Sequence, residues 1–158
     1  MKMFNNFTKI ALFSFGGIGI LILAVYIMLV IVPQGEFITY DDGITVEVNN
    51  KSNQPTPNLK FTLGYSENPD FQNIGVIKPL KSEKSEKLTN NIKTANADLS
   101  LYIEYKLKNG KTKKEDLFYS PAATPQKIVA KIDITEIDKN GKIKFNYKGY
   151  DGASTIEN

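Results

Sequence analysis

The sequence predicts an all-β protein, an antiparallel β-sandwich of seven to eight strands, preceded by one N-terminal transmembrane helix. Three observations carry this prediction. Residues 10–32 form an apolar run without any charge. Several later segments alternate apolar and polar residues, which is the pattern of a strand with one buried face. Two Asn-Gly pairs lie between such segments, and this pair is the strongest short-range signal of a β-hairpin.

The apolar run predicts a helix that spans a bilayer. It reads IALFSFGGIGILILAVYIMLVIV, and only Ser14 and Tyr26 carry polar side-chain groups. A spanning helix needs about 20 apolar residues, whereas the amphipathic helix of a soluble domain would show a polar stripe. A cleaved signal peptide has a shorter apolar core, of ~7–15 residues, followed by small residues. We therefore expect a retained signal anchor, residues 10–32, whose partner is the lipid bilayer.

The charges that flank this helix predict its orientation. Lys2 and Lys9 precede it, and four acids come before the next lysine: Glu36, Asp41, Asp42 and Glu47. Because basic flanks stay on the cytoplasmic side, we expect a single-pass protein of the cell membrane with a cytoplasmic N-terminus, residues 1–9. The expected parts beyond the helix are a juxtamembrane linker or first strand at 33–42, an extracytoplasmic β-sandwich at 43–150 and a flexible tail at 151–158.

Strict alternation predicts five strands, at residues 44–48, 59–65, 99–107, 128–134 and 143–147. Residues 112–119 add a strand, and weaker candidates lie at residues 37–40, 74–77 and 86–92. The inward positions predict a core that includes Val46, Phe61, Leu101, Ile103, Ile132 and Phe145. One apolar face per strand indicates antiparallel sheets with a solvated outer face.

The turn residues agree with these strands. Asn109-Gly110 and Asn140-Gly141 predict two hairpins, because both residue types tolerate positive φ. Residues 81–96 are polar and lack the apolar stripe of a helix, so we expect an edge strand and loops there. The two weak segments 74–77 and 86–92 are the expected sheet edges, and an edge can bind a partner by β-augmentation.

The composition excludes several kinds of chemistry. The chain has no Cys, His, Trp or Arg. Without Cys there is no disulfide, thiolate metal site or thiol nucleophile, and without His there is no Ser-His triad. The 20 lysines stand against 17 acids, a net charge of +3 that is too balanced for a nucleic-acid binder. We expect no enzyme activity and no cofactor.

The candidate metal motifs fit turns better than ligand sets. Glu136-x-Asp138-x-Asn140-Gly141 imitates the start of an EF-hand loop, but Tyr147 occupies the position of the bidentate Glu. We expect a hairpin there. Asp41-Asp42-Gly43 reads as a turn in which Asp bonds to the backbone. The Ser82-Glu83-Lys84-Ser85 run, a formal Ser–Lys pair, reads as a solvated charge run.

Two short elements resemble a known family. Asn49-Asn50-Lys51-Ser52-Asn53 follows a predicted strand, and residues 57–63 and then 74–84 come after it. This order resembles immunoglobulin-like modules of the bacterial cell-adhesion-related (CARDB-like) kind, in which a V-x-N-x-G/S strand end precedes a central strand and an I-x-x-L-x-x-G-x-S segment. Ser82 stands where that second element has Gly.

The resemblance covers about residues 43–108. The chain is also similar to small membrane-anchored, extracytoplasmic proteins of AT-rich, Gram-positive bacteria, and its wealth of Lys, Asn and Ile fits AT-rich codons. The resemblance implies an immunoglobulin-like sandwich outside the cytoplasm. It implies no catalytic residue, since one fold hosts many functions.

Four tyrosines at outward or strand-end positions form the candidate partner-binding surface: Tyr40, Tyr102, Tyr119 and Tyr150. Exposed Tyr favours contact with proteins or sugars. We therefore expect a non-enzymatic binding or adaptor module that engages a protein or cell-wall partner. The alternative is a structural or assembly subunit of a cell-envelope complex that acts through its transmembrane helix. An acid-dependent hydrolase is the third interpretation, although no carboxylate pair is marked by its surroundings.

Overall fold

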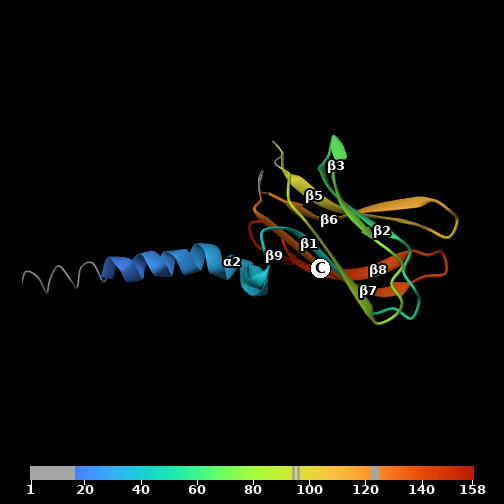
Figure 1. Cartoon of the computed structure of the whole chain (residues 1–158), viewed down its shortest axis with the longest axis horizontal. Helices are drawn as coiled ribbons and strands as arrows, with labels where there is room; N and C mark the ends of the chain where they lie inside the picture. The colour runs from blue at the N-terminus through green and yellow to red at the C-terminus, as the bar shows by residue number, and fades with distance from the viewer. Residues whose placement is uncertain (1–16, 94, 96, 122–124) are drawn as a thin grey trace, which may run out of the picture. The chain divides into compact units, whose positions relative to one another are not determined.

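The computed structural model describes residues 17–93, 95, 97–121 and 125–158. The chain forms two compact units, Met1–Ile38 and Thr39–Asn158. The first unit contains the apolar helix, and the second is built from β-strands (Figure 1).

The helix is continuous over Gly17–Thr39 and is long and apolar enough to cross a membrane. It is α-helical at 17–26, π-helical at η1 (Ile27–Ile31), α-helical again at α2 (Val32–Gln34) and 3-10 at η2 (Gly35–Thr39). Its apolar side chains are exposed, for example Met28 and Leu29. This property suits a membrane anchor and equally a signal sequence. The start of the expected span, residues 10–16, lies outside the described residues.

The strand considered for residues 37–40 is wrong, because the helical structure continues to Thr39. Pro33 lies at the start of α2, where its fixed φ favours a helix. Gly35 then takes a φ of +53° and leads into the 3-10 turn. The segment that alternates apolar and polar residues therefore belongs to a helix as far as Thr39, and it does not form a strand.

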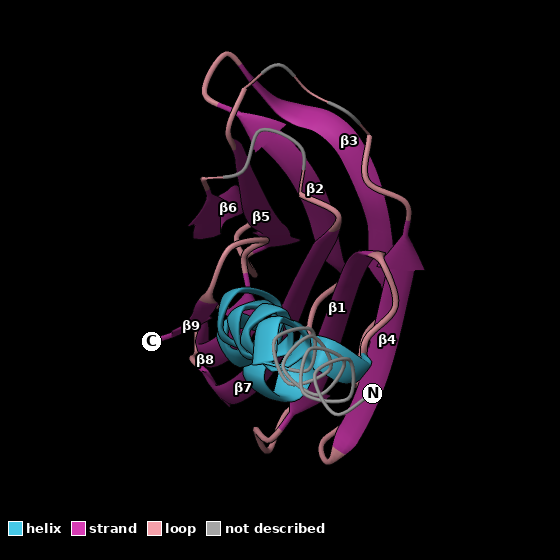
Figure 2. Cartoon of the chain, turned by 90° about the vertical axis from the view of Figure 1, so that its left-hand side faces the viewer, coloured by secondary structure: helices cyan, strands magenta, loops and turns pink. Residues whose placement is uncertain are grey.

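The second unit is a two-layer β-sandwich (Figures 1 and 2). The described residues form nine strands, against the seven to eight expected. The five-stranded sheet has the order β4 (Lys84–Asn90), β1 (Gly43–Asn50), β7 (Lys127–Ile137), β8 (Ile143–Tyr150) and β9 (Thr155–Glu157). The four-stranded sheet has the order β3 (Asn68–Ile77), β2 (Leu59–Tyr65), β5 (Leu99–Lys106) and β6 (Thr112–Ser120).

The core lies between the inward faces of the two sheets. The side chains expected to form it are fully buried at Val46, Phe61, Leu101, Ile103 and Ile132. Phe145 packs against the same cluster but is only partly buried. The strands predicted from strict alternation are therefore confirmed, since their apolar positions face the neighbouring sheet.

One strand pair differs from the antiparallel expectation. β1 runs parallel to β7, from Gly43 opposite Lys127 to Asn50 opposite Ile134, while its other neighbour, β4, is antiparallel. Alternation reports which face of a strand is buried and carries no information on strand direction. The chain end differs too: residues 151–158, expected as a flexible tail, contain β9, which pairs with β8 through Gly149 and Ile156.

Both predicted hairpins are present, with one difference in the turns. Only the glycine of each Asn-Gly pair has positive φ, +82° at Gly110 and at Gly141. Each glycine N–H donates to a carbonyl three residues earlier, at 2.9 Å to Leu107 and 3.0 Å to Asp138. These contacts fit a three-residue loop, in which a type I turn is followed by a left-handed glycine.

A buried polar network holds the loop after β1. The side-chain amide of Asn50, only 1% exposed, donates to the carbonyls of Gln54 at 2.8 Å and Leu80 at 2.9 Å. Its oxygen accepts from the hydroxyl of Ser52 at 2.6 Å. The Ser82 hydroxyl in turn donates to the Ser52 carbonyl at 2.5 Å. The two sequence elements that carry the family resemblance therefore contact each other.

The hairpin between β2 and β3 folds back over its own sheet. A Cβ at Gly64 would come within 2.4 Å of the Asn68 carbonyl oxygen, so only glycine fits there. The Thr62 hydroxyl donates to the Pro69 carbonyl at 3.1 Å. β3 begins at Asn68, directly before Pro69. This fold-back places Asp70 above the outer face of the four-stranded sheet.

Candidate functional site

The four tyrosines proposed as a partner surface do not gather in one place. Tyr40 lies over the outer face of the five-stranded sheet, Tyr102 and Tyr119 are outward positions of β5 and β6, and Tyr150 is buried. Tyr150 lies at a strand end, as expected, because it is the last residue of β8, but it is only 8% exposed and offers little surface to a partner. The unpredicted β9 explains this: Tyr150 has Val129 of β7 on one side and Thr155 of β9 on the other.

Tyr40 is held by charged side chains. Its hydroxyl donates to a carboxylate oxygen of Glu47 at 2.9 Å. The ammonium nitrogens of Lys87 and Lys131 lie 4.9 Å and 5.5 Å from the ring centroid, within the range of cation–π attraction. Partial burial, followed by the Glu47 carboxylate, raises the pKa of the Tyr40 hydroxyl. These partners already occupy the polar tip and face of Tyr40.

Tyr102 belongs to an ionic network on the outer face of the four-stranded sheet. The Lys114 ammonium lies 4.9 Å from the Tyr102 ring centroid and 3.1 Å from an Asp70 carboxylate oxygen. Lys60 reaches the same Asp70 oxygen at 3.5 Å and Glu104 at 3.8 Å. The hydrogen bond from Lys114 is the main cause that lowers the pKa of Asp70. The network joins residues from four strands.

Tyr119 is the most accessible of the four, at 53% exposed. Its hydroxyl donates to a carboxylate oxygen of Asp98, and this hydrogen bond raises the pKa of the tyrosine. Tyr119 lies on β6, which is an edge strand of its sheet. It is therefore the tyrosine whose ring remains most open to a partner.

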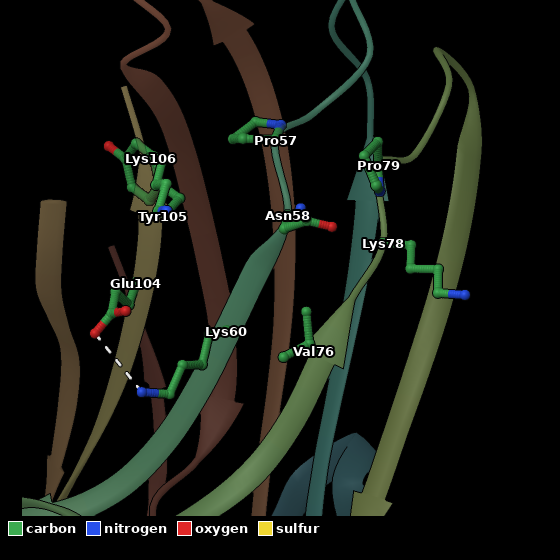
Figure 3. Close-up of a pocket in the computed structure, with 9 residues that line it drawn as sticks. All are labelled: Pro57, Asn58, Lys60, Val76, Lys78, Pro79, Glu104, Tyr105 and Lys106. Carbon is green, nitrogen blue, oxygen red and sulfur yellow. Dashed lines mark ion pairs between the residues drawn. The ribbon is translucent and has the colours of Figure 1, made fainter. Parts of the chain in front are cut away.

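An open cleft on the four-stranded sheet has more of the character of a binding site. It has a volume of about 610 Å³ and is lined from β2, β3, β5 and the segments that flank them. Figure 3 shows Val76 between Lys60 and Lys78, with Pro57 and Pro79 at one end and Glu104 and Lys106 on the β5 side. Val76 is 48% exposed, so its aliphatic side chain is available for contact with a ligand.

The chemistry of the cleft suits binding. Glu104 is the one carboxylate in its lining, and Lys60 neutralises it at 3.8 Å. The other charged groups are two lysines, Lys78 and Lys106, and the rest of the lining is mostly apolar, with Asn58 as a polar member. Within the described ranges no three Asp or Glu side chains gather in a way that could hold a metal ion. The cleft therefore offers apolar contact and positive charge, with no second carboxylate for acid–base work.

The carboxylates of the Glu136-x-Asp138 motif are engaged in the fold. One Asp138 carboxylate oxygen accepts from the backbone N–H groups of Asn140 and Lys142, both at 2.8 Å. Glu136 pairs with Lys144 at 2.7 Å. The hairpin expected for this segment is confirmed. Asp41 and Asp42 border a separate polar cleft with Thr89 and Asn90.

The expected sheet edges are correct, and they face each other. β4 ends the five-stranded sheet and β3 ends the four-stranded sheet. The Asn90 amide donates to the Ile74 carbonyl at 3.3 Å, and the Gln72 amide donates to the Asn91 carbonyl at 2.5 Å. Side chains from each edge thus donate hydrogen bonds to backbone carbonyls beside the other edge. These carbonyls are then not available to pair with an added strand in β-augmentation.

The sequence alone did not indicate the cleft. Val76 was expected only as part of an edge strand, and lysines are too frequent in this chain to mark a site. The cleft depends on strand register, which places Lys60 between Val76 and Glu104. No family model, no curated protein and no solved structure matches this chain.

Proposed function

We propose that this chain is a membrane-anchored, extracytoplasmic binding or adaptor module without enzymatic activity, built as an immunoglobulin-like sandwich. The observation that carries the proposal is the open cleft around Val76. Its exposed aliphatic side chain lies among lysines, beside one neutralised carboxylate. The apolar helix and the excess of lysine before it support the anchor and its orientation.

Topology is the first test. Protease treatment of intact protoplasts should remove a tag fused to the C-terminus, because the β-domain is proposed to lie outside the cell. Permeabilised cells provide the control for tag accessibility. A C-terminal tag that stays protected until the cells are permeabilised would reverse the proposed orientation.

The second test separates the binding module from the helix-mediated assembly subunit. A photoreactive residue placed at Val76 in full-length protein should form an adduct in cells, and one placed at Glu86, an exposed position of β4, is the matched control. The Val76 adduct should persist when residues 10–32 are exchanged for an unrelated spanning helix. An adduct that disappears at normal expression would favour the assembly role of the helix.

A further inference from the structure

The two Asn-Gly hairpins come from different sheets and meet at their tips. The backbone N–H of Lys108, in the β5–β6 turn, donates to the carbonyl of Asn140, in the β7–β8 turn, at 2.9 Å. Both turns lie together at the right-hand end of the β-domain in Figure 1. Four exposed lysines are thereby brought to one end of the sandwich: Lys108, Lys111, Lys139 and Lys142.

This group of lysines continues into the cleft. Lys106 lines the cleft together with Lys78, and it precedes Lys108 by two residues in the same chain segment. Both Lys78 and Lys106 are exposed. We call these six residues the basic track: Lys78, Lys106, Lys108, Lys111, Lys139 and Lys142.

The carboxylates next to the basic track are already engaged. Glu104 pairs with Lys60, Glu115 with Lys113 and Glu136 with Lys144. Asp138 accepts backbone N–H groups of its own turn. In contrast, none of the six track lysines makes an ion pair within the described part of the chain. Lys142 still interacts electrostatically with Asp138 and Glu115, so nearby carboxylates offset the track only in part. A nearly balanced protein, at net charge +3, thus carries a locally positive surface.

We infer that the cleft and the joined hairpin tips bind one linear polyanion along the basic track. This inference rests on the proposed binding function and names the chemistry of the partner. Close, unpaired lysines repel one another, so a chain of anionic groups relieves that repulsion as it binds. Lysine presents a compact charge on a flexible stem and lacks the planar fork of arginine. Such a surface recognises repeated charge more than the shape of a single group.

The test uses the full-length chain in an uncharged detergent and fluorescently labelled inorganic polyphosphate as the probe. Anisotropy at low salt should show binding that weakens steeply as salt is raised. The triple variant Lys108→Gln, Lys111→Gln, Lys139→Gln should bind at least about tenfold more weakly. The matched variant Lys87→Gln, Lys93→Gln, Lys148→Gln removes the same charge elsewhere and should change binding less than about threefold. Circular dichroism checks that both variants are folded.

Poly-L-glutamate serves as the second probe. Equal binding of both polymers supports recognition of any polyanion, and preference for polyphosphate supports recognition of phosphate groups. Binding of neither polymer at ~0.1 M salt, or equal weakening in the two triple variants, overturns the inference. A single-stranded oligonucleotide, itself a linear polyanion, should bind no more tightly than polyphosphate, and tighter binding would overturn recognition by charge alone. If polymer binding fails while the Val76 adduct persists, the proposed binding function stands without this ligand.

Discussion

The two hairpins share the four residues Lys-Asn-Gly-Lys and the same glycine φ of +82°, yet their surroundings differ. A Cβ at Gly110 would meet no atom within 4 Å, whereas a Cβ at Gly141 would lie 3.1 Å from the backbone nitrogen of Lys108. The β5–β6 turn is capped by the neutral side chain of Asn109, and the β7–β8 turn by the carboxylate of Asp138. The identical local sequence therefore forms the same turn in both hairpins. The stability of the two turns nevertheless depends on different neighbours and on different charges.

The largest effect should come from the core that holds the two hairpins together. Phe61→Ala removes a fully buried ring and should reduce the free energy of unfolding by about 3–5 kcal/mol. Phe145→Ala should cost less, because Phe145 is only partly buried. Thermal unfolding of both variants, followed by circular dichroism, measures the difference. Equal losses would show that the partial exposure of Phe145 does not matter.

The loop after β1 is held by the side chain of Asn50, whereas the two hairpin turns depend on the backbone conformation of a glycine. Asn50→Ala removes the donor to the Gln54 and Leu80 carbonyls and the acceptor of the Ser52 hydroxyl. Leaving buried polar groups without partners costs about 1–3 kcal/mol. Chemical denaturation should show a loss in this range. Asn53→Ala is the control in the same loop, at an exposed position, and should be close to neutral.

The glycines of the two turns should respond differently to alanine. Gly110→Ala should cost about 1–2 kcal/mol, the penalty of a left-handed residue. Gly141→Ala carries the same penalty and also presses on the Lys108 backbone, so its loss should be larger. Denaturation curves of the two variants compare them directly. A loss at Gly110 as large as that at Gly141 would argue against the contact between the tips in solution.

The smallest expected effect is a pH dependence of the stability of the β7–β8 turn. Backbone N–H donors, first that of Lys142 and then that of Asn140, lower the pKa of Asp138 in the folded protein. A lowered folded-state pKa stabilises the turn above the ordinary Asp pKa, and this contribution is lost as pH falls through the folded value. The Gly141 amide signal in NMR should shift on acidification, while that of Gly110 stays constant. Asp138→Asn should abolish the shift and keep the turn.

The sequence predicted what depends on local pattern. Alternation identified the strands that carry Val46, Phe61 and Ile132, and Asn-Gly identified both hairpins. It could not predict the direction of β1 against β7, because the buried face is the same for either direction. It also missed β9, whose three residues carry only Ile156 as an apolar signal.

The candidate site was harder to predict from the sequence than the strands and hairpins. Tyr102 and Tyr119 are on the expected outer face, but Tyr150 is buried because β9 lies beside it. The cleft around Val76 and the contact between the hairpin tips join residues far apart in the chain. Such contacts follow from strand register and sheet packing, which no local pattern reports.

The parallel pairing of β1 with β7 has a consequence for the order in which the domain assembles. Gly43 pairs with Lys127, so 84 residues, the difference between these numbers, must follow Gly43 before its partner exists. At a synthesis rate of ~5–20 residues per second, β1 waits about 4–17 s for β7. During this time its antiparallel neighbour β4 is the earlier available partner. β7, which pairs with β1 on one side and β8 on the other, therefore joins the five-stranded sheet late. Nascent chains arrested before Lys127 should lack the protease resistance of the folded domain.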